Sequence, residues 1–470
     1  MVETYLERER KFDVPADFAF PLLPGARRRT HHLRATYYDT DDALLQTQGV
    51  VLRRRVGGTD DGWHVKAPHP DGKVELHADV GPTRPPHELT LLTRGLRFGR
   101  PVHRRALLVT TRDAYRVHDA QGELIAEVAD DRVEAKVTAT NQSLSWREVE
   151  IELGPAGTAE AAERLADLVV AAGGRPAQHA SKYARAVGDG PDHISLSGLA
   201  GLVDDYLQTQ LDRLVWGDLR MRRGENVVHK TRVAVRRTRS TLRIFGALFD
   251  QGCAADLDRE LSWYAETLGR VRDLDVARRR IEDDLAGHAD GLVSEYAAAA
   301  LVGILDRERE EARDRLRAVL DGRRYGALLE ELHGWRCGPP MTSSADAAAA
   351  DVERYVRTAR KKADKRRRRA EKADDESAGR AFHRARKAAK RARYAAELAR
   401  PALGKSAKKA ARSYEKQQDE LGELQDHVML ISLLGGVPAT SDASAEVGFV
   451  CGVLVDRHQR ALRKVHRVLL

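Results

Sequence analysis

The sequence predicts an α+β protein, with a domain of strands over residues 1–190 and a helical domain over residues 191–470. Two observations support this division. Short runs of alternating apolar and polar residues, separated by Gly, Pro and Asp turns, fill most of the first part. From about residue 195 the chain becomes rich in Ala, Leu, Arg and Glu, with a helical pattern. The segment VGDGPDH, residues 187–193, is expected to link the two parts.

Alternation predicts several strands in the first part. The clearest runs are residues 50–56, 62–67, 73–80, 114–119, 124–135 and 146–153. Near the N-terminus, YLERERK is unusually charged, and a period of two places Glu7, Glu9 and Lys11 on one face of an extended segment. One helix is expected after the last strand, ending at Gly173 and Gly174.

The helical part contains an internal repeat. HKTRVAVRRTRSTLR begins at His229 and HRARKAAKRARYAAE begins at His383. LGRVRDLDV places Gly269 forty residues after the first histidine, and LGELQDHVM places Gly422 thirty-nine residues after the second. Two matched elements at matched spacing indicate a duplication. We therefore expect two pseudo-symmetric helical bundles, over about residues 195–337 and 351–470.

Charge and composition narrow the class of partner. Lys and Arg total 80 against 71 Asp and Glu, a net charge of +9, and ten basic residues lie between Arg354 and Arg369. This balance favours an anionic partner such as a phosphate polymer, nucleic acid or a membrane surface. The three cysteines are far apart, which argues against a disulfide scaffold or a zinc site. The charged start and the lack of a long apolar run predict a cytoplasmic protein without a membrane span.

The charged strand faces indicate a ligand class. In WREVEIEL, the side chains of Glu148, Glu150 and Glu152 share one face and apolar side chains share the other. Taken alone, such a strand is most often a surface strand with a wet acidic face. A sheet closed into a barrel with all its charged faces inward would instead surround one lumen with carboxylates and cations. That lumen suits a polyanion bound with Mg²⁺ or Mn²⁺, because these cations prefer carboxylate oxygens while Arg and Lys neutralise phosphate.

These residues resemble the CYTH domain. The motifs that carry the resemblance are ExExK (7–11), YYDT (37–40), LRRR (52–55), WHVK (63–66), EVEIEL (148–153) and SKYARA (181–186). That superfamily covers triphosphate tunnel metalloenzymes, class IV adenylate cyclases and thiamine triphosphatases. The resemblance implies an eight-stranded antiparallel β-tunnel with flanking helices, which binds triphosphate and Mg²⁺ or Mn²⁺. In one departure, the chain has Lys73-Val74-Glu75 where bacterial relatives often have Arg-x-Glu.

Carried over by motif, the resemblance assigns roles to individual residues. The implied catalytic residues are Glu7, Glu9 and Lys11. The implied metal ligands are Glu7, Glu9, Asp131, Glu148, Glu150 and Glu152. The implied triphosphate ligands are Lys11, Arg53, Arg55, Lys66, Lys73, Arg112 and Lys182.

A cationic stripe runs along each repeated helix. The basic residues from His229 are spaced by 3, 4, 3 and 4, which places them on one helix face, and the stripe from His383 repeats this pattern. Like charges at these spacings destabilise a helix, although many charge runs are only solvated faces. These helices resemble the CHAD domain over about residues 195–470, which implies binding of inorganic polyphosphate. The implied polyphosphate ligands are His229, Arg232, Arg236, Arg239, Arg243, His383, Arg386, Lys390 and Arg393.

The resulting functional hypothesis is metal-dependent hydrolysis of inorganic triphosphate, or of a related triphosphate compound, with polyphosphate bound by the helical domain. One alternative is a polyphosphate-binding protein without catalysis, and a second is an adenylate cyclase of the class IV type. No adenine pocket is readable, which favours hydrolysis over cyclisation. Aromatic residues make up only 5% of the chain, so sequence-specific nucleic-acid binding has little support. Association with polyphosphate granules in the cytoplasm is a further expectation.

Overall fold

The computed structural model describes residues 3–21, 23, 25–79, 81, 83–188, 190, 195–287, 293–373, 375–439 and 444–469. Within these ranges, the side chains of residues 3–7, 375–378 and 465–469 are not described. The chain forms two compact units, Met1–His193 and Ile194–Leu470, which are treated separately below. Most of the expected linker, residues 187–193, lies outside the described residues.

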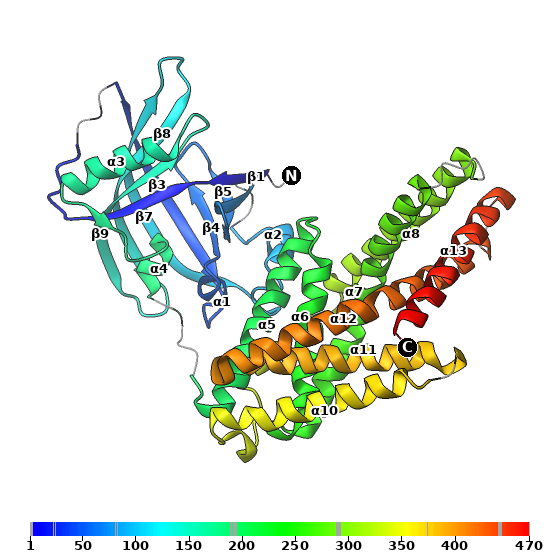
Figure 1. Ribbon diagram of the computed structural model, residues 1–470. Coiled ribbons are helices and arrows are strands. Elements are labelled where there is room, and N and C mark those ends of the chain that lie inside the picture. Colours follow the sequence, from blue (N-terminus) through cyan, green and yellow to red (C-terminus); the bar gives the residue numbers. More distant parts are fainter. Residues whose placement is uncertain are drawn as a thin grey trace. The chain divides into compact units, whose positions relative to one another are not determined.

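One antiparallel sheet forms the body of the first unit (Figure 1). Its strands are β1 (Glu3–Glu7), β2 (Glu9–Val14), β3 (Arg27–Asp39), β4 (Val51–Val56), β5 (Gly62–His69), β6 (Gly72–Ala78), β7 (His103–His118), β8 (Leu124–Val137), β9 (Ser143–Leu153) and β10 (Arg175–Pro176). Their order is β1-β6-β5-β4-β3-β7-β8-β9-β2-β10. Only Arg8 separates β1 from β2, which pair with opposite ends of the β3–β9 sheet. The N-terminal segment therefore joins those ends and closes the sheet around an interior.

The predicted strand number, eight, is wrong. The sheet has nine strands of five residues or more and the two-residue β10 as a tenth. The N-terminal segment supplies two of them because its pairing changes from β6 to β9 at Arg8. The α+β class and the antiparallel sheet are confirmed. Strand β3 was not among the expected runs, because its sequence RRRTHHLRATYYD has too few apolar residues to show a clear alternation.

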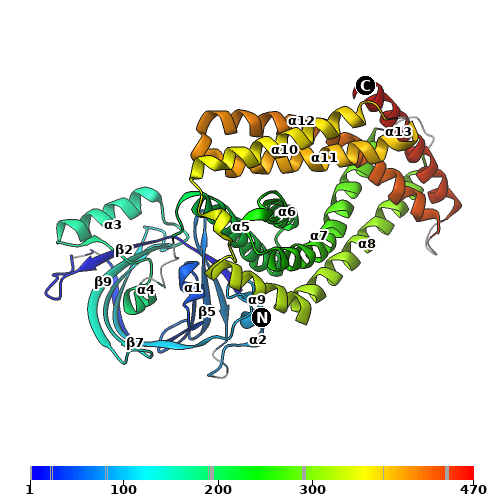
Figure 2. The same ribbon diagram turned by 90° about the horizontal axis from the view of Figure 1, so that it is seen from below.

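Helices cover both faces of this sheet. They are α1 (Leu44–Thr47), α2 (His87–Leu92), α3 (Ala159–Ala171) and α4 (Lys182–Val187). On the outside, Val169 of α3 packs against Val149 and Ile151 of β9. On the inside, Tyr183 of α4 stacks on Tyr37 of β3, with ring centroids 5.2 Å apart and planes at 4°. Figure 2 shows the sheet curving around α4. The apolar packing of α4 therefore fills one end of the interior.

The outer apolar layer determines which face of each strand points inward. Val149 and Ile151 of β9 are almost fully buried under α3, so the alternating Glu148, Glu150 and Glu152 must face the interior. A one-residue shift of register would place carboxylates under α3. Hydrophobic packing outside the sheet thus aligns the charged rows inside it.

The second unit consists of helices in two repeated halves. The first half contains α5 (Gly198–Arg222), α6 (Val228–Ile244), α7 (Gln251–Ala286), α8 (Glu295–Asp321) and α9 (Arg323–Cys337). The second half contains α10 (Val352–Ala370), α11 (Asp375–Leu398), α12 (Arg400–Gly436) and α13 (Ala445–Leu469). The halves meet where α6 packs on α11, α7 on α12 and α8 on α13. None of the helices in the described ranges has the length and apolar composition to cross a membrane.

Equivalent residues of the two halves occupy equivalent places. A Cβ added to Gly269 of α7 would lie 3.5 Å from Arg232 of α6, and one added to Gly422 of α12 would lie 3.5 Å from Arg386 of α11. In each half, a helix glycine leaves room for an arginine of the preceding helix. These two contacts are what the predicted internal repeat would produce.

Gly57, at the β4–β5 turn, offers a test of the sheet. Its φ is +98°, and a Cβ there would lie 2.0 Å from the backbone carbonyl oxygen of His32 on β3. We expect Gly57→Ala to lower the free energy of unfolding by about 2 kcal/mol or more, because it adds a backbone clash to the cost of a positive φ. Gly122→Ala is the matched control, since Gly122 has φ +87° and nothing within 4 Å of its Cβ position. Equal losses for the two variants in urea unfolding would contradict this packing.

Candidate functional site

The interior of the sheet contains a cavity of about 490 Å³ lined by side chains of both charges. The acidic side chains are Glu9, Asp60, Glu75, Glu127, Glu150 and Glu152. The basic side chains are Lys11, Arg29, Arg53, Arg55, Lys66, Lys73, Arg112, Arg116 and Lys182. The size lies within the range of small-molecule sites, and the mixture of charges is the one expected for a polyanion bound with a cation.

Three carboxylates form one row across the sheet. Glu9 of β2 lies opposite Glu152 of β9, and Glu152 lies opposite Glu127 of β8. Side chains opposite each other on one face of a sheet are neighbours, and like charges there repel. Burial raises the pKa of Glu152, and Glu150, Glu127 and Glu9 raise it further against the opposing effect of Lys66. A cation placed at this row would relieve the repulsion.

The ends of the row differ in their partners. The Glu9 carboxylate forms ion pairs with Lys73 at 2.5 Å and with Lys11 at 3.5 Å. Burial raises the pKa of Glu9, but Lys11, Lys73 and Lys66 outweigh it, so the net direction is downward. Glu152 forms no ion pair with any side chain that the structure describes. It is therefore the cavity carboxylate best placed to accept an added cation.

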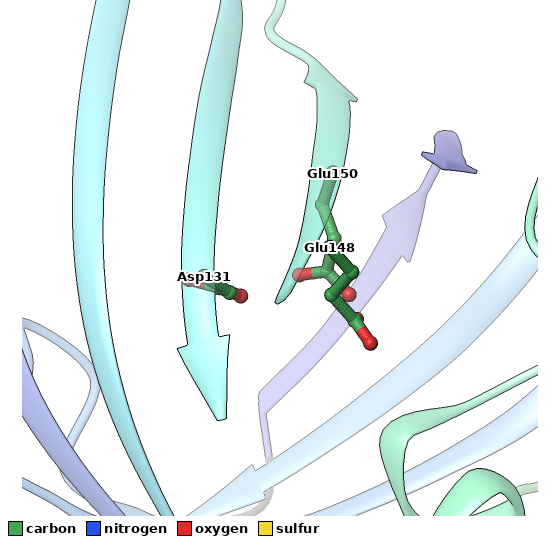
Figure 3. A group of neighbouring side chains, drawn as sticks. All are labelled: Asp131, Glu148 and Glu150. Carbon is green, nitrogen blue, oxygen red and sulfur yellow. The ribbon is translucent and has the colours of Figure 1, made fainter. Parts of the chain in front are cut away.

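Beneath the row, three carboxylates surround the ammonium group of Lys182. Its Nζ lies 2.9 Å from Asp131, 2.7 Å from Glu148 and 2.7 Å from Glu150. Figure 3 shows Asp131 on β8 beside Glu148 and Glu150 on β9, and one oxygen from each lies within 4.8 Å of the others. The three carboxylates are arranged as they would be around a bound cation, and the ammonium group of Lys182 occupies that position.

Glu150 connects this cluster to the cavity. Besides its contact with Lys182, it forms ion pairs with Lys11 and with Arg112, each at 2.6 Å. Burial raises the pKa of Glu150, but the three cations hold it well below its ordinary value. Asp131 and Glu148 are almost fully buried and do not line the cavity.

The predicted metal ligands are thus divided. Glu9, Glu150 and Glu152 line the cavity, whereas Asp131 and Glu148 hold Lys182 below it. The side chain of Glu7 lies outside the described residues. All the predicted triphosphate ligands line the cavity, and they are Lys11, Arg53, Arg55, Lys66, Lys73, Arg112 and Lys182.

The opposite wall of the cavity carries a second acidic centre, Glu75 of β6. Its carboxylate lies 3.4 Å from Lys66, 3.6 Å from Arg53 and 2.7 Å from Nδ1 of His64. Nearby, Arg55 forms an ion pair with Asp60 of the β4–β5 loop. Burial, with Arg53 and Arg112, lowers the pKa of Arg55 to about 9. These cations are therefore held by carboxylates that a phosphate chain would have to replace.

Three lining carboxylates, Asp60, Glu75 and Glu127, were given no role from the sequence. Glu75 lies two residues after Lys73 and Glu127 lies four residues before Asp131, so alternation puts each on the face of a predicted ligand. The same period that placed Glu148, Glu150 and Glu152 would have found these two. Glu75 was noted only as part of Lys73-Val74-Glu75, and Asp60 and Glu127 belong to none of the motifs on which the role assignment rested.

In the helical unit, cations from three helices gather, and the acidic groups nearest to them, chiefly Asp273 and Asp426, favour their charged forms without pairing with them directly. Arg232 and Arg236 of α6, Arg272 of α7, and Arg386 and Lys390 of α11 form this group, named here the five-cation cluster. Among the described residues, none of the five forms an ion pair with a carboxylate. Burial, together with Arg236, Arg386 and Arg232, lowers the pKa of Lys390 to about 6 against the opposing effect of Asp426. The cluster therefore concentrates positive charge, which a bound anion would neutralise.

The rest of the two cationic stripes has other partners. Arg239 and Arg243 contact Asp258 of α7 at 2.9 and 2.6 Å. Arg393 contacts Glu397 and Glu415 at 2.8 and 2.7 Å. The neighbouring helix decides this division, because α7 presents Asp258 at one end of α6 and Gly269 at the other.

The two histidines of the stripes also differ in their surroundings. His229 is near the five-cation cluster, and burial, with Arg272, Arg236 and Arg232, lowers its pKa to about 4. His383 forms a hydrogen bond with Gln425 of α12. Arg272 of the cluster was missed from the sequence, although it precedes Asp273 in the repeated LGRVRDLDV element.

Lys182 is expected to support the sheet as well as the site. Lys182→Met would leave Glu148 buried without a cation, whereas Asp131 would keep its two-point ion pair with Arg112. We therefore expect a loss of about 3 kcal/mol in the free energy of unfolding at pH 7. In the wild type, the lowered pKa values of Asp131 and Glu150 contribute stability that is lost as the pH falls below about 4. The variant should lose less on acidification. Parallel pH profiles of urea unfolding would contradict this account of Lys182.

Comparisons with known proteins match one domain family to each of the two compact units. The CYTH domain family matches residues 6–184 and the CHAD domain family matches residues 205–435. The uncharacterised protein Rv2226 of Mycobacterium tuberculosis is 29% identical over 483 residues, covering 96% of this chain and 92% of that protein. The crystal structure of the CHAD domain from the plant Ricinus communis has a TM-score of 0.47 at 24% identity and covers 59% of this chain and 95% of its own.

A third similarity is to a further solved structure. HpAC1 from Hippeastrum, a proposed adenylyl cyclase with a dominant triphosphatase activity, has a TM-score of 0.24 at 17% identity and covers 38% of this chain and 94% of its own. The two family matches follow each other in the order expected from the motifs, one within each compact unit. The chain is therefore a CYTH–CHAD protein, with a CYTH domain in its first unit and a CHAD domain in its second.

Proposed function

We propose that the cavity of the CYTH domain binds a triphosphate together with Mg²⁺ or Mn²⁺ and hydrolyses a phosphoanhydride bond. The observation that carries this proposal is the row of Glu9, Glu152 and Glu127, which lies in one cavity with lysines and arginines from several other strands. Carboxylates on one wall and cations around them match the two needs of a triphosphate bound with a divalent cation.

The donor set fits a hard divalent cation. Glu9, Glu127, Glu150 and Glu152 offer only carboxylate oxygens, the ligands that Mg²⁺ and Mn²⁺ prefer, and the cavity lining contains no cysteine. Glu152 has the raised pKa and the unshared carboxylate expected of a group that is completed by a cation. Such a metal would supply charge neutralisation at the phosphate oxygens and activation of water at neutral pH.

The side chains of the chain itself would position the phosphates. Lys66 and Arg53 are held by Glu75, and Arg55 is held by Asp60, so a phosphate oxygen could take the place of each carboxylate. Arg is suited to this because its planar fork binds two oxygens at once. Lys182 differs, since it is anchored by Asp131 and Glu148 and is expected to stay in place. Phosphoryl transfer depends mainly on positioning and charge stabilisation, so no protein nucleophile is required.

For the CHAD domain we propose binding of inorganic polyphosphate at the five-cation cluster. The cations lower one another's pKa values, which means that each destabilises the charged form of its neighbours. A chain of phosphates would relieve this repulsion at several points at once. The equivalent positions of Arg232 and Arg386 let both halves of the repeat contact one chain.

The carboxylate row can be tested by phosphate release from inorganic triphosphate with Mg²⁺ or Mn²⁺. We expect Glu152→Gln and Glu9→Gln each to lower kcat by about a hundredfold or more, because loss of an outer-shell contact already costs 10- to 100-fold. Glu134→Gln is the matched control, since Glu134 lies on the exposed outer face of β8.

The products separate the proposal from its rivals. No turnover by folded wild-type protein with either metal would exclude the hydrolase and leave a polyphosphate-binding protein. Release of pyrophosphate from ATP, without phosphate from triphosphate, would identify a cyclase. Unchanged turnover in Glu152→Gln and Glu9→Gln would place the metal elsewhere.

Lys390 gives polyphosphate binding a defined pH dependence. Its pKa of about 6 in the free protein means that the amine is mostly neutral at pH 8. Bound phosphate would raise the pKa of Lys390, so above pH 6 the binding of polyphosphate would be coupled to the uptake of a proton by this amine. The affinity would therefore fall by as much as about tenfold per pH unit. Titration calorimetry at pH 6, 7 and 8 should show this loss for wild type, whereas Lys390→Arg, which keeps its charge, should show much less. The control is Lys408→Arg on the exposed face of α12, and identical pH profiles for all three proteins would contradict the assignment.

A further inference from the structure

A second cavity lies in the CHAD domain, bordered by α11, α12 and α13. It has a volume of about 780 Å³ and is named here the apolar trough. Its apolar surface comes from Phe382, Leu421, Leu424, Val428 and Leu462. None of the functions proposed above uses this cavity.

The floor of the trough is an open edge of a hydrophobic core. Phe382, Leu421 and Leu424 belong to the cluster that joins α10, α11 and α12, and Leu462 of α13 packs against it. Val428, on the turns of α12 above them, keeps 40% of its surface exposed. Apolar area left in water forgoes about 25 cal/mol per Å², so an alkyl chain that covered this floor would be stabilised by burying it.

The rim of the trough is cationic. Arg380 and Arg384 lie one helical turn apart on α11, and Arg463 lies on α13. No described carboxylate lines the trough, and none of the three arginines forms an ion pair with a described residue. The three arginines border the apolar residues of the same cavity. Charge and floor together fit a molecule that is anionic at one end and apolar along the rest.

We propose that the apolar trough binds a single-chain amphiphilic anion, with its phosphate or carboxylate head between Arg380, Arg384 and Arg463 and its alkyl chain on Phe382, Leu424 and Val428. The volume lies within the range of sites for ligands of this size. Polyphosphate does not fit, because it has no apolar part to cover the floor. A neutral lipid would leave three arginines without a counter-charge. The inference stands independently of the triphosphatase and polyphosphate proposals.

This proposal is tested by measuring whether dodecyl phosphate and laurate bind saturably to the full chain below their micelle concentrations. Titration calorimetry should show both binding more tightly than dodecyl maltoside, which has the chain without the charge, and than inorganic phosphate, which has the charge without the chain. Val428→Glu should weaken dodecyl phosphate binding by about tenfold or more, since it puts a carboxylate on the apolar floor. Phe449→Glu is the matched control, because Phe449 of α13 is also exposed, at 56%, but does not line the trough.

A second variant keeps the result decisive if Val428→Glu disturbs the fold. Arg384→Gln should reduce the preference for dodecyl phosphate over dodecyl maltoside while leaving dodecyl maltoside binding unchanged. Arg386→Gln, in the five-cation cluster, should leave the preference intact. Absence of saturable binding, or equal affinity for the charged and neutral amphiphiles, would overturn the proposal. Binding only to phosphatidylglycerol vesicles, with none of the monomeric amphiphiles, would also overturn it and indicate a membrane-facing surface.

Discussion

The mutual neutralisation of buried charges inside the β-sheet is the constraint on which the first domain depends. Asp131, Glu148 and Glu150 would be too costly to bury alone. Lys182 contacts all three, and Arg112 also pairs with Asp131 and Glu150. Because α4 carries Lys182 and also stacks Tyr183 against Tyr37, one short helix supplies both the counter-charge and the apolar plug. The cavity above it can then hold carboxylates whose pairing is incomplete, as at Glu152. Structural neutralisation and ligand binding are separated by a single layer of side chains.

The CHAD domain uses charge in the opposite way. Its five-cation cluster is unneutralised, and the repeat explains how such a cluster can persist. Gly269 and Gly422 leave space in which Arg232 and Arg386 lie along the neighbouring helices, while apolar packing of the long helices provides the stability that the cluster takes away. Where the same stripe meets Asp258, the positive charge is cancelled. The first domain therefore contains mainly paired charges, whereas the second contains a group of cations without ion pairs among the described residues.

Much of this organisation was readable from the sequence, and the failures have physical causes. Alternation placed Glu148, Glu150 and Glu152 on one face because a pleated strand has a strict period of two. The same rule does not reveal that Lys182, far along the chain, occupies the space between carboxylates. Helical spacing put Arg239 and Arg243 beside Arg236, but only the approach of α7 determines which of them meet an acid. The break at Arg8 was also hidden, because nothing local to a strand reports a change of partner. Periodicity predicts which residues share a face of a strand or helix, whereas tertiary contacts determine which residues that face contacts.

The closure of the sheet at Arg8 has a consequence for how the protein is made. Strand β2 pairs with β9, so residues near position 9 must wait for residues near position 152 before the cylinder can close. Pairings of such high sequence separation form slowly because loop-closure entropy must be overcome first. During synthesis, the N-terminal strands therefore leave the ribosome long before their partner exists. The interior cavity is accordingly a late product of folding, and the emerging chain carries an open sheet edge until β9 arrives.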